Sequence, residues 1–280
     1  SLASIDKSNK KKLLGDYKSV FNGIALNVSD SEAQEIKKIS GVKAVYPNYE
    51  VHPTLMDSVP LIGANQVWQL DAKGNNCIQS GQPCLTGKGI KIAVLDTGVD
   101  YRHPDLGGCT TNQFLNKQCS KFLGGWDFYD DPDPMDHTSY PAHGTHVTSI
   151  IAGNGDWNHN GIVEANEGLN GIAPDAKIYA YAVIGEFFGL ESWVLGGIDR
   201  SLDSNQDGIF NDKVDIISMS LGISCSNYSG DCGPDDPVTQ AVDNAVDAGV
   251  VVVVSAGNCG PRGSGQCDKL GDYTISSPGA

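Results

Sequence analysis

The chain of 280 residues has no long hydrophobic run and little positive charge. A membrane-spanning helix needs about 18 or more consecutive apolar residues, whereas runs such as Val250–Val254 are far shorter and read as buried strands. Only 19 Lys and Arg stand against 34 Asp and Glu, which gives a formal net charge of −15. The sequence therefore predicts no membrane span. It also argues against nucleic acid as a partner, because surfaces that bind nucleic acid are basic.

The eight cysteines include no Cys-x-x-Cys pair, which argues against a structural zinc site. They fall instead into four close couples: Cys77/Cys84, Cys109/Cys119, Cys225/Cys232 and Cys259/Cys267. An even number in local couples predicts disulfides and thus a secreted, extracellular protein, while the connectivity itself stays open. The first residue is Ser1 and no signal peptide follows it, so we expect the natural chain to begin further upstream.

Residues 1–57 differ from the rest of the chain in charge and in pattern. They hold 8 Lys and 7 acidic residues, so the excess negative charge belongs to residues 58–280. The segments 20–28 and 42–47 are typical of strands. Between them, Ser29-Asp30-Ser31-Glu32 is a capping box that opens a helix through about Ile39. The order strand, helix, strand predicts a small α+β domain over residues 1–57.

From Gly87 onward, short apolar segments alternate with helical patterns. The predicted helices are 190–203 and a helix that starts at Pro237 after the N-cap Asp236. The predicted strands are 89–95, 177–183, 214–219 and 249–255. This alternation predicts an α/β domain over residues 58–280, a parallel sheet with helices on both faces. Sites in such sheets lie at the carboxyl ends of the strands.

Asp96 and His143 are the two candidate catalytic residues in this domain. Asp96 follows the apolar run 90–95, and His143 opens a predicted helix. A carboxylate can orient an imidazole, which then deprotonates a weak nucleophile. Taken singly, an Asp before a turn is more often a cap, and a lone His is more often structural. His146, one helical turn after His143, reads as a buried, hydrogen-bonded histidine. A metallohydrolase using Asp96, His143 and His146 is an alternative.

Four stretches resemble the subtilisin-like serine proteases, in the order found in that family: 93–105 (AVLDTGVDYRHPD), 143–153 (HGTHVTSIIAG), 216–222 (IISMSLG) and 250–260 (VVVVVSAGNCG). The resemblance implies a subtilisin-like α/β catalytic domain that hydrolyses peptide and protein substrates. It implies that Asp96 orients His143 as general base, and that Asn258 donates a hydrogen bond to the oxyanion. It further implies that Ser220, Leu221 and Gly222 pair with the substrate backbone.

The chain departs from this family in its nucleophile. A Gly-Thr-Ser-Met-Ala type motif, which carries the family's serine, occurs nowhere in the 280 residues. We therefore expect the serine to lie beyond Ala280 and this chain alone to be inactive.

Residues 1–57 resemble the propeptide of the same family, through Phe21-Asn22-Gly23 and the segment 41–47. The resemblance implies a ferredoxin-like domain, incomplete at its start, that assists folding and occupies the substrate cleft until it is cleaved. Because the segment 58–64 looks like a mature start, we expect cleavage between about Val51 and Val59.

Two loops have oxygen-bearing side chains at alternating positions, the pattern of a calcium loop. In the first loop Gly161 stands at the sharp turn, and the predicted ligands are Asp156, Asn158, Asn160, the Ile162 carbonyl and Glu167. The second loop has Val214 at the closing position, so it can close only through Asn211 or Asp212, and its predicted ligands are Asp203, Asn205, Asp207 and Asp212. Both loops predict Ca²⁺ as a structural ion, with a plain surface loop as the alternative.

The sequence therefore favours a secreted, calcium-stabilised serine endopeptidase. A non-catalytic, calcium-dependent binding protein built on a protease fold is the alternative from another functional class.

Overall fold

The computed structural model describes residues 13–17, 23–46, 55–128, 133, 143–155, 170–185, 188–222, 236–257 and 278. The chain divides into two compact units, residues 1–53 and 54–280. We call them the N-terminal unit and the sheet unit and describe each by itself. The domain boundary after residue 57 stays a prediction.

The N-terminal unit contains two antiparallel strands, β1 (Leu13–Tyr17) and β2 (Gly23–Leu26), followed by helix α1 (Asp30–Lys37). The predicted capping box is present, since the Ser29 hydroxyl accepts from the Glu32 backbone N–H and the Ser29 N–H donates to the Glu32 carboxylate at 2.8 Å. No residue of α1 is buried. A strand over residues 42–47 was wrong for the described part, because residues 42–46 are irregular. Strand β1 was not among the predicted elements.

The sheet unit is built on five parallel strands in the order β4-β5-β3-β6-β7. They are β3 (Lys91–Asp96), β4 (Phe122–Asp127), β5 (Lys177–Ala182), β6 (Ile216–Met219) and β7 (Val251–Val254). The predicted α/β class and all four predicted strands are confirmed. The edge strand β4 was missed because Gly124 and Gly125 weaken its strand signal. β3 lies in the centre, so its carboxyl end is surrounded by other chain segments.

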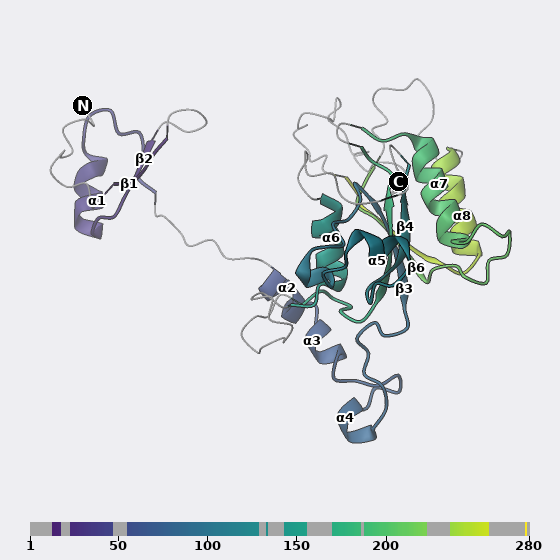
Figure 1. Ribbon diagram of the computed structural model, residues 1–280. Coiled ribbons are helices and arrows are strands. Elements are labelled where there is room, and N and C mark those ends of the chain that lie inside the picture. Colours follow the sequence, from purple (N-terminus) through teal and green to yellow (C-terminus); the bar gives the residue numbers. More distant parts are fainter. Residues whose placement is uncertain are drawn as a thin grey trace. The chain divides into compact units, whose positions relative to one another are not determined.

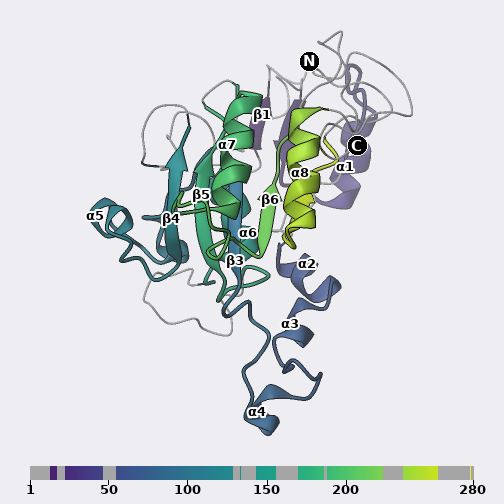
Figure 2. The same cartoon turned by 90° about the vertical axis from the view of Figure 1, so that its right-hand side faces the viewer.

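Helices cover both faces of the sheet, as predicted (Figures 1 and 2). On one face, α5 (Thr111–Leu115) and α6 (His143–Ala152) pack over a buried cluster that contains Val94, Phe114 and Ala152. On the other face, α7 (Glu191–Leu202) and α8 (Pro237–Asp247) pack over a cluster that contains Leu95 and Ile198. Alternate residues of β3 therefore enter the two cores, as the pleat of a strand requires.

The two longest helices described, α7 and α8, differ in whether a side chain caps their first turn. Helix α8 has the predicted N-cap, with the Asp236 carboxylate accepting from the Val238 and Thr239 N–H groups at 2.9 and 3.0 Å. Helix α7 begins after Leu190, which offers no side-chain hydrogen bond to the helix. Its packing against β3 and β5 therefore determines where it begins.

Short elements precede the sheet: α2 (Leu55–Leu61), α3 (Ala64–Val67) and α4 (Cys77–Ser80), with the 3₁₀ turn η2 (Pro104–Leu106) after β3.

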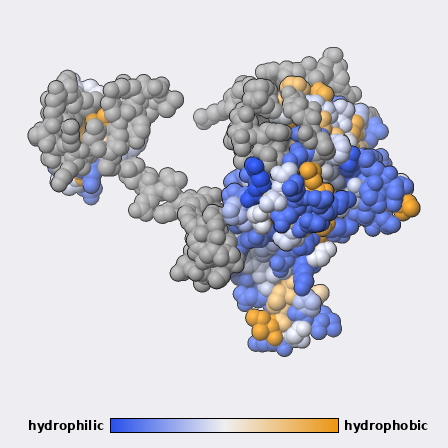
Figure 3. Space-filling model, in the orientation of Figure 1, coloured by the Kyte–Doolittle hydropathy of each residue, from blue (hydrophilic) through white to orange (hydrophobic). Residues whose placement is uncertain are grey.

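Cys77 is bonded to Cys84 and Cys109 to Cys119, which confirms two of the four predicted couples. The couples at 225/232 and 259/267 lie outside the described residues. On the face that Figure 3 shows, the coloured residues of the sheet unit are mostly hydrophilic, with an orange area near α4, the helix that contains the exposed Ile78. Single exposed apolar side chains are normal on folded proteins. In the described part of the chain, no helix has the length and apolar character needed to span a membrane.

Candidate active site

Asp96 ends the central strand β3 and is fully buried. Its carbonyl accepts hydrogen bonds from the Val183 and Ile184 N–H groups at 2.8 and 3.2 Å, which fixes the strand end against the segment after β5. Its side-chain Oδ1 accepts the Thr97 N–H at 2.8 Å. The carboxylate is therefore held in one position at the carboxyl end of the sheet, where sites of open α/β folds lie.

His143 is the first residue of α6, and its Nδ1 lies 2.6 Å from Asp96 Oδ1. Because an ionised carboxylate can only accept hydrogen bonds, Nδ1 carries a proton and donates a hydrogen bond to Asp96. In the neutral ring this leaves Nε2 as a proton acceptor. The His143 side chain is 49% exposed while that of Asp96 is 0% exposed, so the imidazole is reachable although its partner is not. The geometry joins the two residues that the sequence singled out.

Three neighbours bring the helix start to the strand end. A Cβ on Gly144 would lie 2.0 Å from the Gly98 carbonyl oxygen, so only glycine permits this approach. The Gly144 N–H donates to Thr97 Oγ1 at 3.0 Å, and Thr145 Oγ1 accepts the Asp100 N–H at 2.8 Å. The sequence reading missed the two threonines. Their signal was a hydroxyl residue one position after Asp96 and two positions after His143, the kind of side chain that caps backbone N–H groups.

The carboxylate of Asp96 is electrostatically unusual. Burial raises the pKa of Asp96, and the hydrogen bonds from His143 and from the Thr97 N–H oppose that rise. Its second oxygen, Oδ2, is buried and has no hydrogen-bond partner in the part of the chain that the structure describes. A buried carboxyl oxygen left unpaired costs stability, and such groups concentrate at functional sites. This supports a chemical role for Asp96 and not a role as a simple turn cap.

His146 does not behave as predicted. It is exposed, because it lies on the same side of α6 as His143, while Gly144, Thr145 and Thr148 face the interior. Within the described ranges, no three His, Cys, Asp or Glu side chains are grouped so that they could hold one metal ion. The arrangement thus gives no support to a metal site made of Asp96, His143 and His146.

The segment Ser220–Gly222 directly follows β6, whose last residue, Met219, pairs with Leu95 of β3. Ser220 therefore lies level with Asp96, at the same end of the sheet. The Leu221 carbonyl accepts a hydrogen bond from Ser255 Oγ at 2.9 Å, which ties this segment to the end of β7. Asn258 and the predicted calcium ligands Asp156, Asn158, Asn160, Ile162 and Glu167 lie outside the described residues.

The second candidate calcium loop is described, and it is closed by its own hydrogen bonds. Asp203 accepts the Asp207 and Gly208 N–H groups at 3.1 and 2.7 Å. Asp212 Oδ2 accepts the Ser204 hydroxyl at 2.6 Å and the Asn205 N–H at 3.0 Å. Burial raises the pKa of Asp212, but these hydrogen bonds outweigh it and leave the pKa below its usual value. Asp212 Oδ1 is buried and has no partner among the described residues. Asp203, Asp207 and Asp212 are nevertheless not grouped so that they could hold one metal ion.

Comparisons with known proteins find relatives of this chain among the peptidases. A family model described as "Subtilase family" matches residues 87–280, and one described as "Peptidase inhibitor I9" matches residues 1–54. The minor extracellular protease Vpr of Bacillus subtilis is 34% identical over 96% of this chain and 29% of its own length. The major intracellular serine protease of the same species is 36% identical over 74% of this chain and 50% of its own length. The chain thus spans half or less of the length of these two relatives.

Proposed function

Because the chain belongs to the subtilase family, we propose that it is part of a serine endopeptidase and supplies that enzyme's general base. The observation that carries the proposal is the 2.6 Å contact between His143 Nδ1 and Asp96 Oδ1. Asp96 holds the ring in the tautomer whose Nε2 accepts a proton, and it stabilises the imidazolium that forms. The half-exposed His143 ring can then take a proton from a serine and return it to the leaving amine.

Besides this pair, the reaction needs a nucleophile, an oxyanion donor and a segment that binds the substrate. We propose that the serine lies in a stretch of the longer protein and that Asn258 donates to the oxyanion, a contact worth about 3–4 kcal/mol of transition-state stabilisation. Ser220, Leu221 and Gly222 would pair with the peptide substrate, since Ser220 is level with Asp96.

The N-terminal unit is the proposed inhibitor of this site. The match of residues 1–54 to an inhibitor family supports this role. We propose that residues 1–57 occupy the cleft of residues 58–280 until the chain is cut between about Val51 and Val59. A synthetic or recombinant segment 1–57 added to the mature enzyme should inhibit it, and a lack of inhibition at high concentration would refute this part of the proposal.

Secretion is a further part of the proposal. Two disulfides favour an oxidising compartment. One relative is named extracellular, although another is named intracellular. Detection of the protein in the culture medium of its host, with these cysteines oxidised, tests this point.

Calcium is the ion that we propose for the loops 156–167 and 203–212. In the second loop, Gly208 has φ +81° at the position of the sharp turn, and Asp212 Oδ1 still lacks a partner. To hold the ion, Asp203, Asn205, Asp207 and Asp212 would have to converge, because the described carboxylates form no metal-holding group. The ion would stabilise the loop and take no part in the reaction. EDTA should lower the melting temperature and added Ca²⁺ should restore it. An unchanged melting curve and no calcium in the purified protein would count against both loops.

Active-site labelling tests the enzyme proposal in the longer protein that contains the serine. A fluorophosphonate should label the wild type, and His143→Ala should abolish labelling. His146→Ala is the matched control, because His146 is an exposed histidine one turn later on α6 and should keep full labelling. Asp96→Asn should lower kcat by about 10⁴-fold. Labelling that survives His143→Ala would contradict the assigned general base.

A further inference from the structure

A hollow of about 280 Å³ opens at the β4 edge of the sheet unit, and none of its lining residues belongs to the Asp96–His143 site. Tyr179, on its wall, pairs in register with Ala93, three residues before Asp96. At about 3.3 Å per strand residue, that places the hollow roughly 10 Å along the sheet from the catalytic pair. The volume suits one small ligand or one side chain, and not a protein surface.

The hollow exists because β4 has no side chains at its middle. Gly124 and Gly125 line it, and the ladder between β4 and β5 is interrupted between Phe122 and Gly124. A Cβ on Gly124 would lie 3.6 Å from the Tyr179 ring and would begin to fill the space. The irregular ladder also makes β4 a poor edge for adding a further strand. The space is therefore shaped for a compact ligand against the tyrosine rings.

Aromatic rings form its walls. Tyr179 and Tyr181 lie parallel, with centroids 6.2 Å apart and planes 8° apart. The Arg200 guanidinium lies 4.1 Å from the centroid of the Trp126 ring, which holds this cation at the rim. Flat apolar walls favour a ligand with a planar or apolar body.

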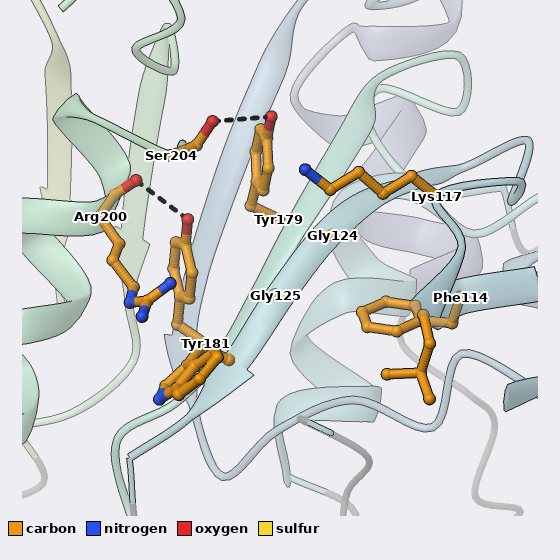
Figure 4. Close-up of a pocket in the computed structure, with 10 residues that line it drawn as sticks. Phe114, Lys117, Gly124, Gly125, Tyr179, Tyr181, Arg200 and Ser204 are labelled. Carbon is orange, nitrogen blue, oxygen red and sulfur yellow. Dashed lines mark hydrogen bonds between the residues drawn. The ribbon is translucent and has the colours of Figure 1, made fainter. Parts of the chain in front are cut away.

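The hydroxyl groups of the hollow already have partners. Tyr179 and Ser204 are hydrogen-bonded at 3.1 Å, and Ser204 donates onward to Asp212 at 2.6 Å. Tyr181 donates to the Arg200 carbonyl at 3.0 Å (Figure 4). A neutral ligand such as a sugar would need these hydroxyls for recognition. The charged groups that remain for a ligand are cations, next to backbone groups of the edge strand β4.

Two cations line the hollow, Lys117 and Arg200 (Figure 4). Among the residues that the structure describes, neither side chain has a carboxylate partner within ion-pair distance. Two unpaired cations next to aromatic walls are suited to an anionic group on an apolar body.

We propose that this hollow binds an organic carboxylate, with the apolar body against Tyr179 and Tyr181 and the carboxylate between Lys117 and Arg200. The carboxylate comes either from a small free acid or from the C-terminus of a peptide. The site is independent of the proposed catalytic function, because it shares no residue with the Asp96–His143 pair.

Titration of the ¹⁵N-labelled full chain with benzoate tests the proposal, with benzamide as the neutral control of the same shape. Benzoate should shift the amide signals of Gly124 and Gly125 and the indole signal of Trp126, with a Kd of about 1 mM for so small a ligand. Benzamide should bind at least about tenfold more weakly. A second pair, N-acetylphenylalanine and its amide, distinguishes the sources. Tighter binding of N-acetylphenylalanine than of benzoate identifies a peptide C-terminus, and weaker binding identifies a small free acid.

Charge-removing variants complete the test. The double variant Lys117→Gln/Arg200→Gln should weaken benzoate binding by at least about tenfold. Lys88→Gln is the matched control, since it removes one positive charge from an exposed position outside the hollow and should bind as the wild type does. The proposal is overturned if benzamide binds as tightly as benzoate, if the double variant binds like the wild type, or if saturating benzoate leaves the Gly124, Gly125 and Trp126 signals in place.

Discussion

Helix α1 of the N-terminal unit begins with a complete capping box but buries none of its residues. Helix α7 of the sheet unit has no side-chain cap, yet it buries Val194, Gly197, Ile198 and Ser201. The first helix is thus specified by hydrogen bonds within its own few residues, and the second by packing on the sheet. The comparison shows that a clear helix signal in the sequence says little about how strongly the helix is held. It also predicts that substitutions in the N-terminal unit cost less free energy of unfolding than substitutions in the sheet unit, and that their effects stay within the N-terminal unit.

The largest difference is expected for glycines. Gly144→Val places a side chain against the Gly98 carbonyl, where a Cβ alone would lie at 2.0 Å, so the start of α6 must move. We expect a loss of about 3 kcal/mol or more in the free energy of unfolding, together with loss of the His143–Asp96 hydrogen bond. Urea unfolding and the NMR signal of the His143 Nδ1 proton measure both effects.

Gly41→Ala is the counterpart in the N-terminal unit. Gly41 has φ +95° and open space around it, so only backbone strain of about 1 kcal/mol is expected, confined to that unit. An intact His143–Asp96 hydrogen bond in Gly144→Val would contradict the view that close backbone approach creates the site.

Matched isoleucines give the next difference. Ile198 in α7 is 2% exposed and lies in the core, so Ile198→Ala should cost about 2–5 kcal/mol. Ile36 in α1 is only partly buried, so Ile36→Ala should cost less than about 1 kcal/mol. Urea denaturation followed by tryptophan fluorescence measures the loss in the sheet unit, because all four tryptophans lie there. Amide hydrogen exchange along α1 measures the loss in the N-terminal unit. Equal losses for the two variants would show that α1 has a core that its burial does not reveal.

The same contrast explains how much of the fold could be predicted from the sequence. The caps of α1 and α8 and the apolar runs of β3, β5, β6 and β7 are local signals, and all of them were found. Strand β4 was missed because it owes its place to pairing with β5, while its two glycines carry no strand signal. Residues 42–46 have a strand-like pattern but no partner strand among the described residues, so the local signal did not decide their structure.

The site follows the same logic. Asp96 and His143 could be predicted as residue types at a strand end and a helix start. Their contact depends on Thr97, Gly144 and Thr145, which act through the folded backbone and have no distinctive spacing. His146 was misjudged because sequence spacing gives the helix face but not which face is covered.

A buried lysine gives a pH-dependent difference. Lys121 donates to the carbonyls of Ala152, the last residue of α6, and of Pro174, and burial lowers the pKa of Lys121 to about 8 from 10.5. Between these two pH values the unfolded chain binds more protons than the folded one, so this group makes the folded state more stable as the pH rises. The free energy of unfolding of the wild type should therefore increase relative to that of Lys121→Met over this range, as measured by urea denaturation.

Lys38 is the control for this effect in the N-terminal unit. It pairs with Glu35 on the surface, with 70% and 72% of the two side chains exposed, so its contribution is small. Lys38→Met should run parallel to the wild type at every pH. If the free energy of unfolding of Lys121→Met also ran parallel to that of the wild type at every pH, Lys121 would not be desolvated in the folded protein.

The smallest effect is expected for the cap of α1. Ser29→Ala removes the hydroxyl that accepts the Glu32 N–H and should weaken α1 by about 1 kcal/mol, whereas Ser29→Asp keeps an acceptor and should not. Because no residue of α1 is fully buried, little of this loss is shared with a core, so amide hydrogen exchange should speed up along α1 alone. The urea midpoint of the sheet unit should stay unchanged. If that midpoint moved, the cap would be coupled to the sheet unit, and the two units could no longer be treated as separately stabilised.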